Sequence, residues 1–184
     1  MTSTIQELSD WKDPVSLLLE TPAGLSEEVV RFISQQKNEP LWMLEKRLLG
    51  LKLYNDMPLP SWGPSLSNLE LEKIHYFRLP NAKHNASSWE DLPDDVKKTF
   101  EKLGIPEAEK KSLSGAGAQY ESLIVYHKLK KEWEEVGVLF EDMDVAVQKY
   151  PELVQQYFMI CVPPTLHKFA ALHAAVWSGG TFIY

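Results

Sequence analysis

The stretch Ser34–Leu51, SQQKNEPLWMLEKRLLGL, carries the most regular apolar pattern of the chain. Its periodic positions, at spacings of three, four and three residues, are Leu41, Leu44, Leu48 and Leu51. Such spacing is typical of one face of an α-helix. Pro40 fits the first turn of this helix, because a missing N–H costs nothing there. The pattern predicts a helix that ends near Met57, before a break at Pro58, Pro60, Gly63 and Pro64.

A second helix is expected just upstream of this stretch. Ser26 is a suitable N-cap, and the acidic residues that follow it favour a helix start. Apolar residues then continue at helical spacing up to about Lys37. Residues 1–25 mix Thr, Ser, Asp and Pro with one short apolar stretch, Val15–Leu19. We expect them to form a flexible arm or a short helix.

The rest of the chain contains signals for both helices and strands. Helices are expected over Pro93–Gly104, from Pro106 over a short charged segment, over Lys128–Val136, from Asp144 to Tyr150, from Pro151 onward and over Lys168–Trp177. Strands are expected over 74–79, 122–126, 138–140 and 181–184. These signals predict an α+β fold that is predominantly helical, with a few short strands.

The final strand, Thr181–Tyr184, stands apart because no hairpin follows it. A short strand without a partner leaves backbone N–H and C=O groups unpaired. We therefore expect that this strand lacks a sheet of its own and that the natural chain continues beyond Tyr184.

Composition excludes several classes of function. The chain has 184 residues, is 44% hydrophobic and 24% charged, and carries a formal net charge of −7. Those proportions indicate a soluble globular protein. The acidic balance argues against a nucleic-acid partner. The basic group Lys128, Lys130 and Lys131 runs into Glu132, Glu134 and Glu135, as on a solvated helix face.

Targeting signals and disulfides are also not indicated. The N-terminus has no basic patch followed by an apolar core, so it does not resemble a secretory signal. No apolar run approaches the roughly 18 residues that span a bilayer. The single cysteine, Cys161, has no second thiol with which to pair. These features predict a cytoplasmic protein that is not bound to a membrane.

Residue types that carry chemistry do not form a recognisable site in the sequence. The five histidines, which never occur at the i, i+4 spacing of a helical metal site, are His75, His84, His127, His167 and His173. His173 is expected to be a packed or capping residue. His167 and Cys161 could form a nucleophilic pair only if the fold brought them together. We therefore expect no catalytic, cofactor-binding or metal-ligating residue in this chain.

Three further patterns have structural explanations. Gly115–Gly117 has neither the third glycine nor the Lys-Ser or Lys-Thr of a phosphate loop, so a flexible connector is expected. The acidic groups at 90–91, 94–95 and 141–144 do not fit the twelve-residue calcium loop. The tryptophans, which are expected to pack in the core, are Trp11, Trp42, Trp62, Trp89, Trp133 and Trp177.

Several motifs, taken in order, resemble one known family. Ser34–Arg47 is similar to the K-x-E-P-x-W-M-L-x-x-R element near the start of SufB and related SufB/SufD family proteins. Further similar segments are Pro60–Pro64 (PSWGP), Leu103–Glu109 (LGIPEAE), Gly137–Phe140 (GVLF), Tyr150–Val154 (YPELV), Val162–Pro164 (VPP) and Lys168–Tyr184 (KFAALHAAVWSGGTFIY). The resemblance runs from about residue 26 to the end of the chain.

The resemblance implies a fold and a domain division. After an arm over residues 1–25, residues 26–164 would be the N-terminal domain of a SufB-like protein. Residues 165–184 would be the helix and first strand that lead into a right-handed parallel β-helix, which this chain does not include.

The resemblance also implies a function. Proteins of the SufB type act as scaffold subunits in iron–sulfur cluster assembly by the SUF system, within a SufBCD-type complex. They work with the ATPase SufC, with SufD and with a cysteine desulfurase as the sulfur donor. The iron–sulfur cluster is implied for the full-length family protein and not for this fragment, because one thiol falls short of the usual four ligands. On this reading the chain is not an enzyme.

Two other functions are compatible with the residues. One is a stand-alone helical protein-interaction module without cluster chemistry. The other is a small hydrolase or transferase that uses Cys161. The only feature of the sequence that supports this second function is the single thiol.

Overall fold

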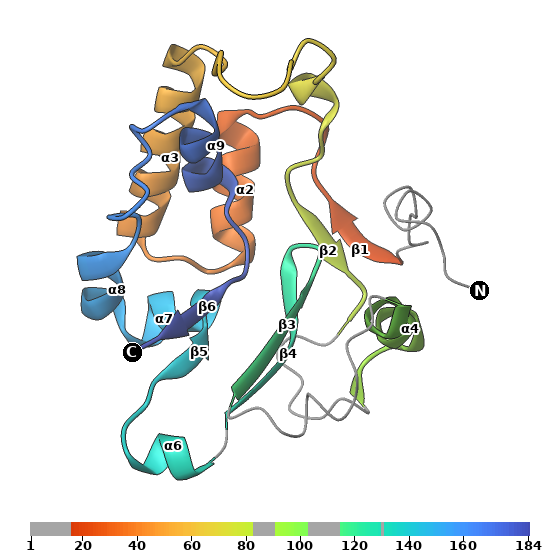
Figure 1. Cartoon of the computed structure of the whole chain (residues 1–184), viewed down its shortest axis with the longest axis vertical. Coiled ribbons are helices and arrows are strands. Elements are labelled where there is room, and N and C mark those ends of the chain that lie inside the picture. Colours follow the sequence, from red (N-terminus) through yellow and green to blue (C-terminus); the bar gives the residue numbers. More distant parts are fainter. Residues whose placement is uncertain (1–15, 83–90, 103–114, 130) are drawn as a thin grey trace.

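The computed structural model describes residues 16–82, 91–102, 115–129 and 131–184 (Figure 1). Its helices are α2 (Glu27–Gln36), α3 (Leu41–Asp56), α4 (Asp94–Lys102), α6 (Lys131–Glu135), α7 (Met143–Lys149), α8 (Pro151–Tyr157) and α9 (Lys168–Val176), with a short 3₁₀ turn at Leu71–Lys73. Its strands are β1 (Leu17–Glu20), β2 (Arg78–Pro80), β3 (Gly115–Tyr120), β4 (Leu123–Leu129), β5 (Phe140–Asp142) and β6 (Thr181–Ile183). The expected α+β class is confirmed.

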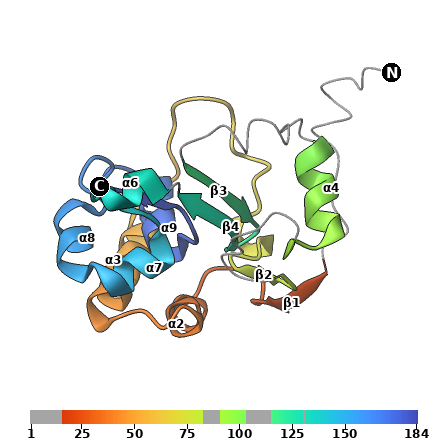
Figure 2. The same cartoon turned by 90° about the horizontal axis from the view of Figure 1, so that it is seen from below.

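The strands form three separate ribbons, each of two antiparallel strands: β1 with β2, β3 with β4, and β5 with β6. Helices α2, α3 and α9 lie side by side, with α7, α8 and the β5–β6 ribbon below them (Figure 1). Seen from below, the other two ribbons lie beside this helical part, and α4 lies at the far edge (Figure 2). The molecule thus has a helical part and a strand-rich part.

The most extensive helix–helix contact in the helical part is between α3 and α9, and a glycine allows their backbones to come close. A Cβ atom added to Gly50 would lie 2.8 Å from the backbone nitrogen of Ala175 and 2.9 Å from the Cβ of Ala174. Small residues on both helices therefore let the two backbones approach each other closely. Lys168, at the start of α9, donates hydrogen bonds to the carbonyls of Tyr54 and Met57 at 2.6 and 2.9 Å, so the end of α3 is also tied to α9.

Helix α3 is confirmed, but the leucines that reveal it are not its buried face. Leu41 is 69% exposed, and of the four periodic leucines Leu51 is in the buried core. The residues that α3 does bury are Met43, Arg47, Gly50, Leu51 and Tyr54. The buried face is set by the approach of α9 at Gly50 and by the contacts of Arg47, neither of which a hydrophobic pattern records.

Helices α2, α4, α8 and α9 also lie where they were expected. The hydroxyl of Ser26 accepts a hydrogen bond from the backbone N–H of Val29 at 3.2 Å, which confirms the predicted N-cap of α2. Pro151 occupies the first turn of α8. The helix predicted from Pro106 lies outside the described residues.

Gly115–Gly117 is not a loop, as the sequence suggested, but the start of strand β3. It pairs with β4 through Leu129, Lys128 and His127, and Glu121 and Ser122 form the turn between the two strands. The predicted helix over Lys128–Val136 is correspondingly wrong in its first part. Lys128 belongs to β4, and the helix begins only at Lys131.

The start of α7 also differs from expectation. The N-cap is Asp142, whose carboxylate accepts a hydrogen bond from the backbone N–H of Asp144 at 3.0 Å. Asp144 was predicted as the cap but lies in the first turn. Strand β5 lies at 140–142 rather than 138–140, and its pairing with β6 extends to the contact of Asp142 with Thr181. The helix therefore starts directly where the ribbon ends.

The expectation that Thr181–Tyr184 lacks a sheet partner is wrong. Strand β6 pairs with β5, with Phe140 opposite Ile183. The backbone groups of Leu139 and Tyr184 exchange two hydrogen bonds of 2.9 Å. The partner lies some forty residues upstream, so no local turn signalled it. Leu17–Glu20 is likewise strand β1, paired with β2, and not a helix or a loose segment.

Four apolar clusters hold these parts together. Helix α4 packs against the β3–β4 ribbon through Val96, Phe100 and Val125. Met43 of α3 shares a cluster with α7, α8 and Phe182 of β6. The other two clusters join α2 to β2 and to the α3–α9 pair. No helix among residues 16–82, 91–102, 115–129 and 131–184 is long and apolar enough to cross a membrane.

The contact at Gly50 gives a direct test of the α3–α9 packing. Gly50→Ala places a methyl group within 3.0 Å of α9, and overpacking of this kind costs about 1–3 kcal/mol. Alanine favours a helix by about 1 kcal/mol over glycine, so the net loss of unfolding free energy in urea should be about 0–2 kcal/mol. Leu49→Ala is the control, because Leu49 is 52% exposed on the same helix. If Gly50→Ala is instead more stable than the natural chain by about 1 kcal/mol, as helix propensity alone predicts, the close approach is wrong.

Candidate functional site: a buried charged centre

Three charged side chains from the end of α2, the connection to α3 and the start of α3 lie inside the molecule. Lys37 is at the C-terminal end of α2, Glu39 precedes α3, and Arg47 is in the second turn of α3. The exposed fractions of their side chains are 6%, 3% and 0%. Buried charges are tolerated only when they are paired and hydrogen-bonded, so their partners define this centre.

Arg47 has the most complete set of partners. Its guanidinium donates to both carboxylate oxygens of Glu39, at 2.7 and 2.6 Å. It also donates to the carbonyls of Ala175 and Trp177, at 3.1 and 3.0 Å, and its Cζ lies 4.6 Å from the centre of the Trp177 ring. The planar guanidinium suits this fork-like pairing. Arg47 therefore joins the start of α3 to the end of α9.

Lys37 makes the second buried ion pair, with Asp144 of α7. Its ammonium donates to Asp144 Oδ2 and lies 5.9 and 5.8 Å from the centres of the Phe77 and Trp177 rings. Gln148 of α7 donates to the backbone carbonyl of Lys37 at 3.1 Å. These contacts join α2 to α7 at the point where two apolar clusters meet.

Asp144 is the least satisfied member of the centre. Its side chain is 9% exposed, and burial raises the pKa of its carboxyl above the ordinary value of 3.8, although Lys37 acts in the opposite direction. Its second oxygen, Oδ1, is buried and has no hydrogen-bond partner among the described residues. A cavity of about 300 Å³ opens beside it. We call this cavity the Lys37 pocket.

Three histidines, His75, His167 and His173, have side chains in the part of the chain that the structure describes, and each has its own surroundings. His75 Nδ1 lies 2.7 Å from the carbonyl of Thr21. His167 is the N-cap of α9 and accepts from the backbone N–H of Ala170 at 3.1 Å, the capping role considered for His173. Partial burial, and then the charge of Arg47, lower the pKa of His173. The side chains of His84 and His127 lie outside the described part.

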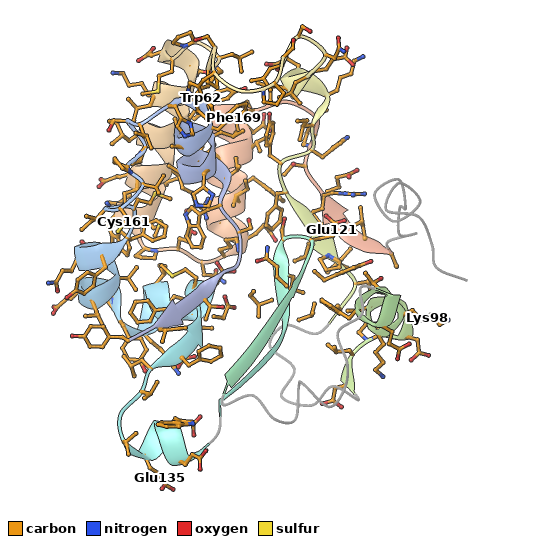
Figure 3. All side chains as sticks on the ribbon, in the orientation of Figure 1. Trp62, Lys98, Glu121, Glu135, Cys161 and Phe169 are labelled. Carbon is orange, nitrogen blue, oxygen red and sulfur yellow. The ribbon has the colours of Figure 1, made fainter. Side chains whose placement is uncertain are left out.

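Cys161 is exposed in the connection between α8 and α9, at the outer edge of the molecule (Figure 3). Trp62 lies near Phe169 at the other end of that connection (Figure 3), and its ring centre is 5.6 Å from that of His167. Within residues 16–82, 91–102, 115–129 and 131–184, no group of three His, Cys, Asp or Glu residues could hold a metal ion. The geometry thus offers binding surfaces and buried ion pairs.

The charged centre was missed because no sequence pattern joins Lys37, Glu39 and Arg47 to Asp144, which was predicted as a helix N-cap. One signal was present. Arg47 lies four residues after Met43 and four before Leu51, so a helix places it on a face with apolar residues on either side. A charge in such a position indicates a buried ion pair. Nothing in the sequence indicated that Asp144 would be the partner of Lys37, 107 residues away.

The chain is similar over its whole length to part of a set of longer proteins. It is 48% identical over 189 aligned positions to an iron–sulfur cluster assembly SufBD family protein of Staphylococcus aureus strain USA300. It is 47% identical over 188 positions to a protein of the same description from Staphylococcus haemolyticus. The alignments cover 100% of this chain but 40% of each relative, so the chain spans less than half the length of these relatives. No protein-family model matches it.

The buried Asp144 predicts a pH effect on stability. Because its pKa is raised on folding, the folded chain binds a proton at a pH where the unfolded chain does not. The contribution of Asp144 to the free energy of unfolding therefore rises as pH falls through the folded pKa toward 3.8.

Asp144→Asn removes this titration. The difference in unfolding free energy between the natural chain and the Asp144→Asn variant should grow in favour of the natural chain as the pH is lowered from about 7 to about 4. Urea unfolding at a series of pH values measures it. A difference that shrinks toward pH 4 would show that folding lowers this pKa.

Proposed function

We propose that this chain belongs to the SufBD family of iron–sulfur cluster assembly proteins and is part of a SufB-type scaffold subunit. The observation that carries the proposal is the 48% identity over the whole chain to a SufBD family protein. The segment Ser34–Arg47, which resembles the SufB element, also supplies the buried charged centre through Lys37, Glu39 and Arg47. A structural role for these three residues explains why the segment contains a Lys, a Glu and an Arg at these positions.

We infer that the chain is the N-terminal part of that subunit. Residues 1–25 would be an arm, residues 26–164 the N-terminal domain, and residues 165–184 the entry into a parallel β-helix. The coverage of 40% of each relative supports a longer natural protein. The proposed boundary after residue 164 does not separate two apolar cores, because α9 packs against α3 and β6 pairs with β5 across it. On this proposal the entry segment is anchored in the domain that precedes it.

The proposed role is assembly rather than catalysis, with the iron–sulfur cluster as the cargo of the full-length subunit. The residues described here do not fit a cluster. Cys161 is the one cysteine of the sequence, and protein-bound clusters usually take four ligands. Thiolates for a nascent cluster would therefore have to come from outside this chain.

The proposed partners are the SUF components: the ATPase SufC, SufD and a cysteine desulfurase that supplies sulfur. An apolar surface supports a role in binding other proteins. It follows the connection between α8 and α9 and the end of β6, where the exposed apolar residues are Tyr157, Ile160, Val162, Leu166, Ile183 and Tyr184. We call it the α8 surface. The rings of Tyr157 and Tyr184 lie 6.2 Å apart, and contiguous exposed apolar residues typically mark an interaction site. Cytoplasmic localisation remains part of the proposal.

Co-purification of the full-length protein tests this function. A tagged full-length protein should capture SufC and SufD from a mixture of the purified components. Absence of capture of SufC, SufD and the desulfurase would contradict the proposed function.

The double substitution Ile160→Asp with Leu166→Asp should weaken capture about tenfold, which corresponds to about 1.4 kcal/mol, if the α8 surface is the contact. Val136→Asp is the matched control, because Val136 is 71% exposed but lies in the turn after α6. Equal capture by both variants would place the contact on another surface.

A further inference from the structure

A groove lies where the chain leaves β1 and enters α2. It is lined by residues 19–26, by Glu28, Val29 and Phe32 of α2, and by Glu72 of the 3₁₀ turn. Its volume of about 460 Å³ is within the range of roughly 300–1,000 Å³ that binding pockets usually have. We call it the β1–α2 groove. It shares no lining residue with the Lys37 pocket or with the α8 surface, so it is a separate candidate site.

The backbone that lines the groove is held in place by hydrogen bonds to the chain before β2. The N–H of Thr21 donates to the carbonyl of Phe77 at 3.0 Å, and the N–H of Gly24 donates to that of Ile74 at 2.9 Å. Gly24 has a φ of +87°, and a Cβ atom added to it would lie 3.2 Å from Glu72 Oε2. The glycine therefore lets the Glu72 carboxylate lie close to this backbone. The groove is formed before any partner binds, which lowers the cost of binding.

The groove carries negative charge that the described part of the chain does not fully neutralise. Three of its twelve lining residues are Glu, and none is Lys, Arg or His. One of them, Glu20, is paired with Arg78 Nε at 2.8 Å. Among the residues that the structure describes, Glu28 and Glu72 have no ion-pair partner. Both residues are exposed, so a cation can reach their carboxylates from outside.

The basic residues next to these two carboxylates in the sequence are already bound. Arg31 pairs with Glu27 at 2.7 Å, and Lys73 pairs with Glu70 at 2.7 Å. Glu28 lies in the first turn of α2, where the helix N-terminus supplies a partial charge of about half a unit. That partial charge does not balance a full negative charge. The groove therefore favours a cationic group over an anionic one.

Much of the remaining lining is apolar. The lining residues with apolar side chains are Leu19, Pro22, Ala23, Leu25, Val29 and Phe32. Arginine and lysine lay their methylene stems along apolar surface and keep the charged head outside it. A guanidinium has five N–H donors in a fixed plane and is weakly hydrated, whereas an ammonium is compact and strongly hydrated. A groove that combines two free carboxylates with apolar side chains thus suits arginine better than lysine.

We propose that the β1–α2 groove binds an arginine side chain of a partner protein, with the guanidinium paired to Glu28 and Glu72 and the methylene stem on the apolar lining. The net charge of −7 favours the approach of a partner with a basic surface. The site does not require the proposed assembly function, because it depends only on the residues that line the groove.

An NMR titration of the ¹⁵N-labelled 184-residue chain with three probes tests the site. The first is the capped peptide acetyl-Leu-Arg-Leu-amide. The second has citrulline in place of arginine, which keeps the stem and the shape but carries no charge. The third is methylguanidinium, which keeps the charge but has no stem.

The arginine peptide should shift the backbone signals of Gly24, Glu28 and Glu72 in a saturable way, with a dissociation constant of about 1 mM. The citrulline peptide and methylguanidinium should each bind at least about fivefold more weakly, because each lacks one half of the interaction. This comparison on the natural chain needs no variant to fold.

Two substitutions in the groove and one outside it locate the binding. Glu28→Gln and Glu72→Gln should each weaken binding of the arginine peptide about threefold, as for an exposed ion pair, and the double variant should weaken it about tenfold. Binding of the citrulline peptide should not change. Glu45→Gln is the matched control, because Glu45 is exposed on α3 and its loss changes the net charge equally. At physiological salt it should change binding less than about 1.5-fold.

Equal affinities for the arginine and citrulline peptides would overturn the proposal. So would a Glu45→Gln variant that loses as much affinity as the two groove variants, since the attraction would then be one of net charge. Binding of methylguanidinium as tight as that of the arginine peptide would exclude a role for the apolar lining and would contradict the proposal too. The absence of a saturable shift at about 20 mM peptide, where a site with a dissociation constant of about 1 mM is nearly full, would also exclude the site.

Discussion

The arrangement of the helical part depends on the guanidinium of Arg47. It is fully buried, and its donors reach the carboxylate of Glu39 and the carbonyls of Ala175 and Trp177. The last carbonyls of a helix have no partner within the helix, so Arg47 satisfies groups at the end of α9 that would otherwise be buried unpaired. This fixes α9 along α3, where Gly50 leaves room for its backbone. Strand β6 follows α9 in the chain, so the position of α9 places β6 beside β5, with which it pairs.

The sequence was most informative where structure is local. Ser26, Pro151 and the periodic residues of α3 mark helix ends and helices correctly, because capping and periodicity act within a few residues. It was least informative where contacts with a distant segment of the chain determine the local structure. Gly115–Gly117 forms a strand because β4 pairs with it. Thr181–Ile183 has a partner because the chain after α9 passes beside β5. The same holds for the charged centre, in which Lys37 meets Asp144 across the chain.

The segment that resembles the SufB element is thus above all a structural one. Its two buried ion pairs join α2, α3, α7 and α9. The surfaces available to other molecules lie outside this segment or at its edge. The α8 surface is apolar and exposed, as a contact within an assembly requires. The Lys37 pocket borders the second ion pair. The relatives that this chain matches over part of their length are named for iron–sulfur cluster assembly, and this combination is that of a domain that holds binding surfaces in place.

A double-mutant cycle on Glu39 and Arg47 tests this view most directly. Arg47→Met and Glu39→Met are each expected to lower the unfolding free energy in urea by about 3–5 kcal/mol, because each leaves the other charge buried without a partner. The double variant should lose less than the sum of the two, with a coupling energy of at least about 2 kcal/mol. Effects that simply add, to within about 0.5 kcal/mol, would show that the pair does not hold the helices together.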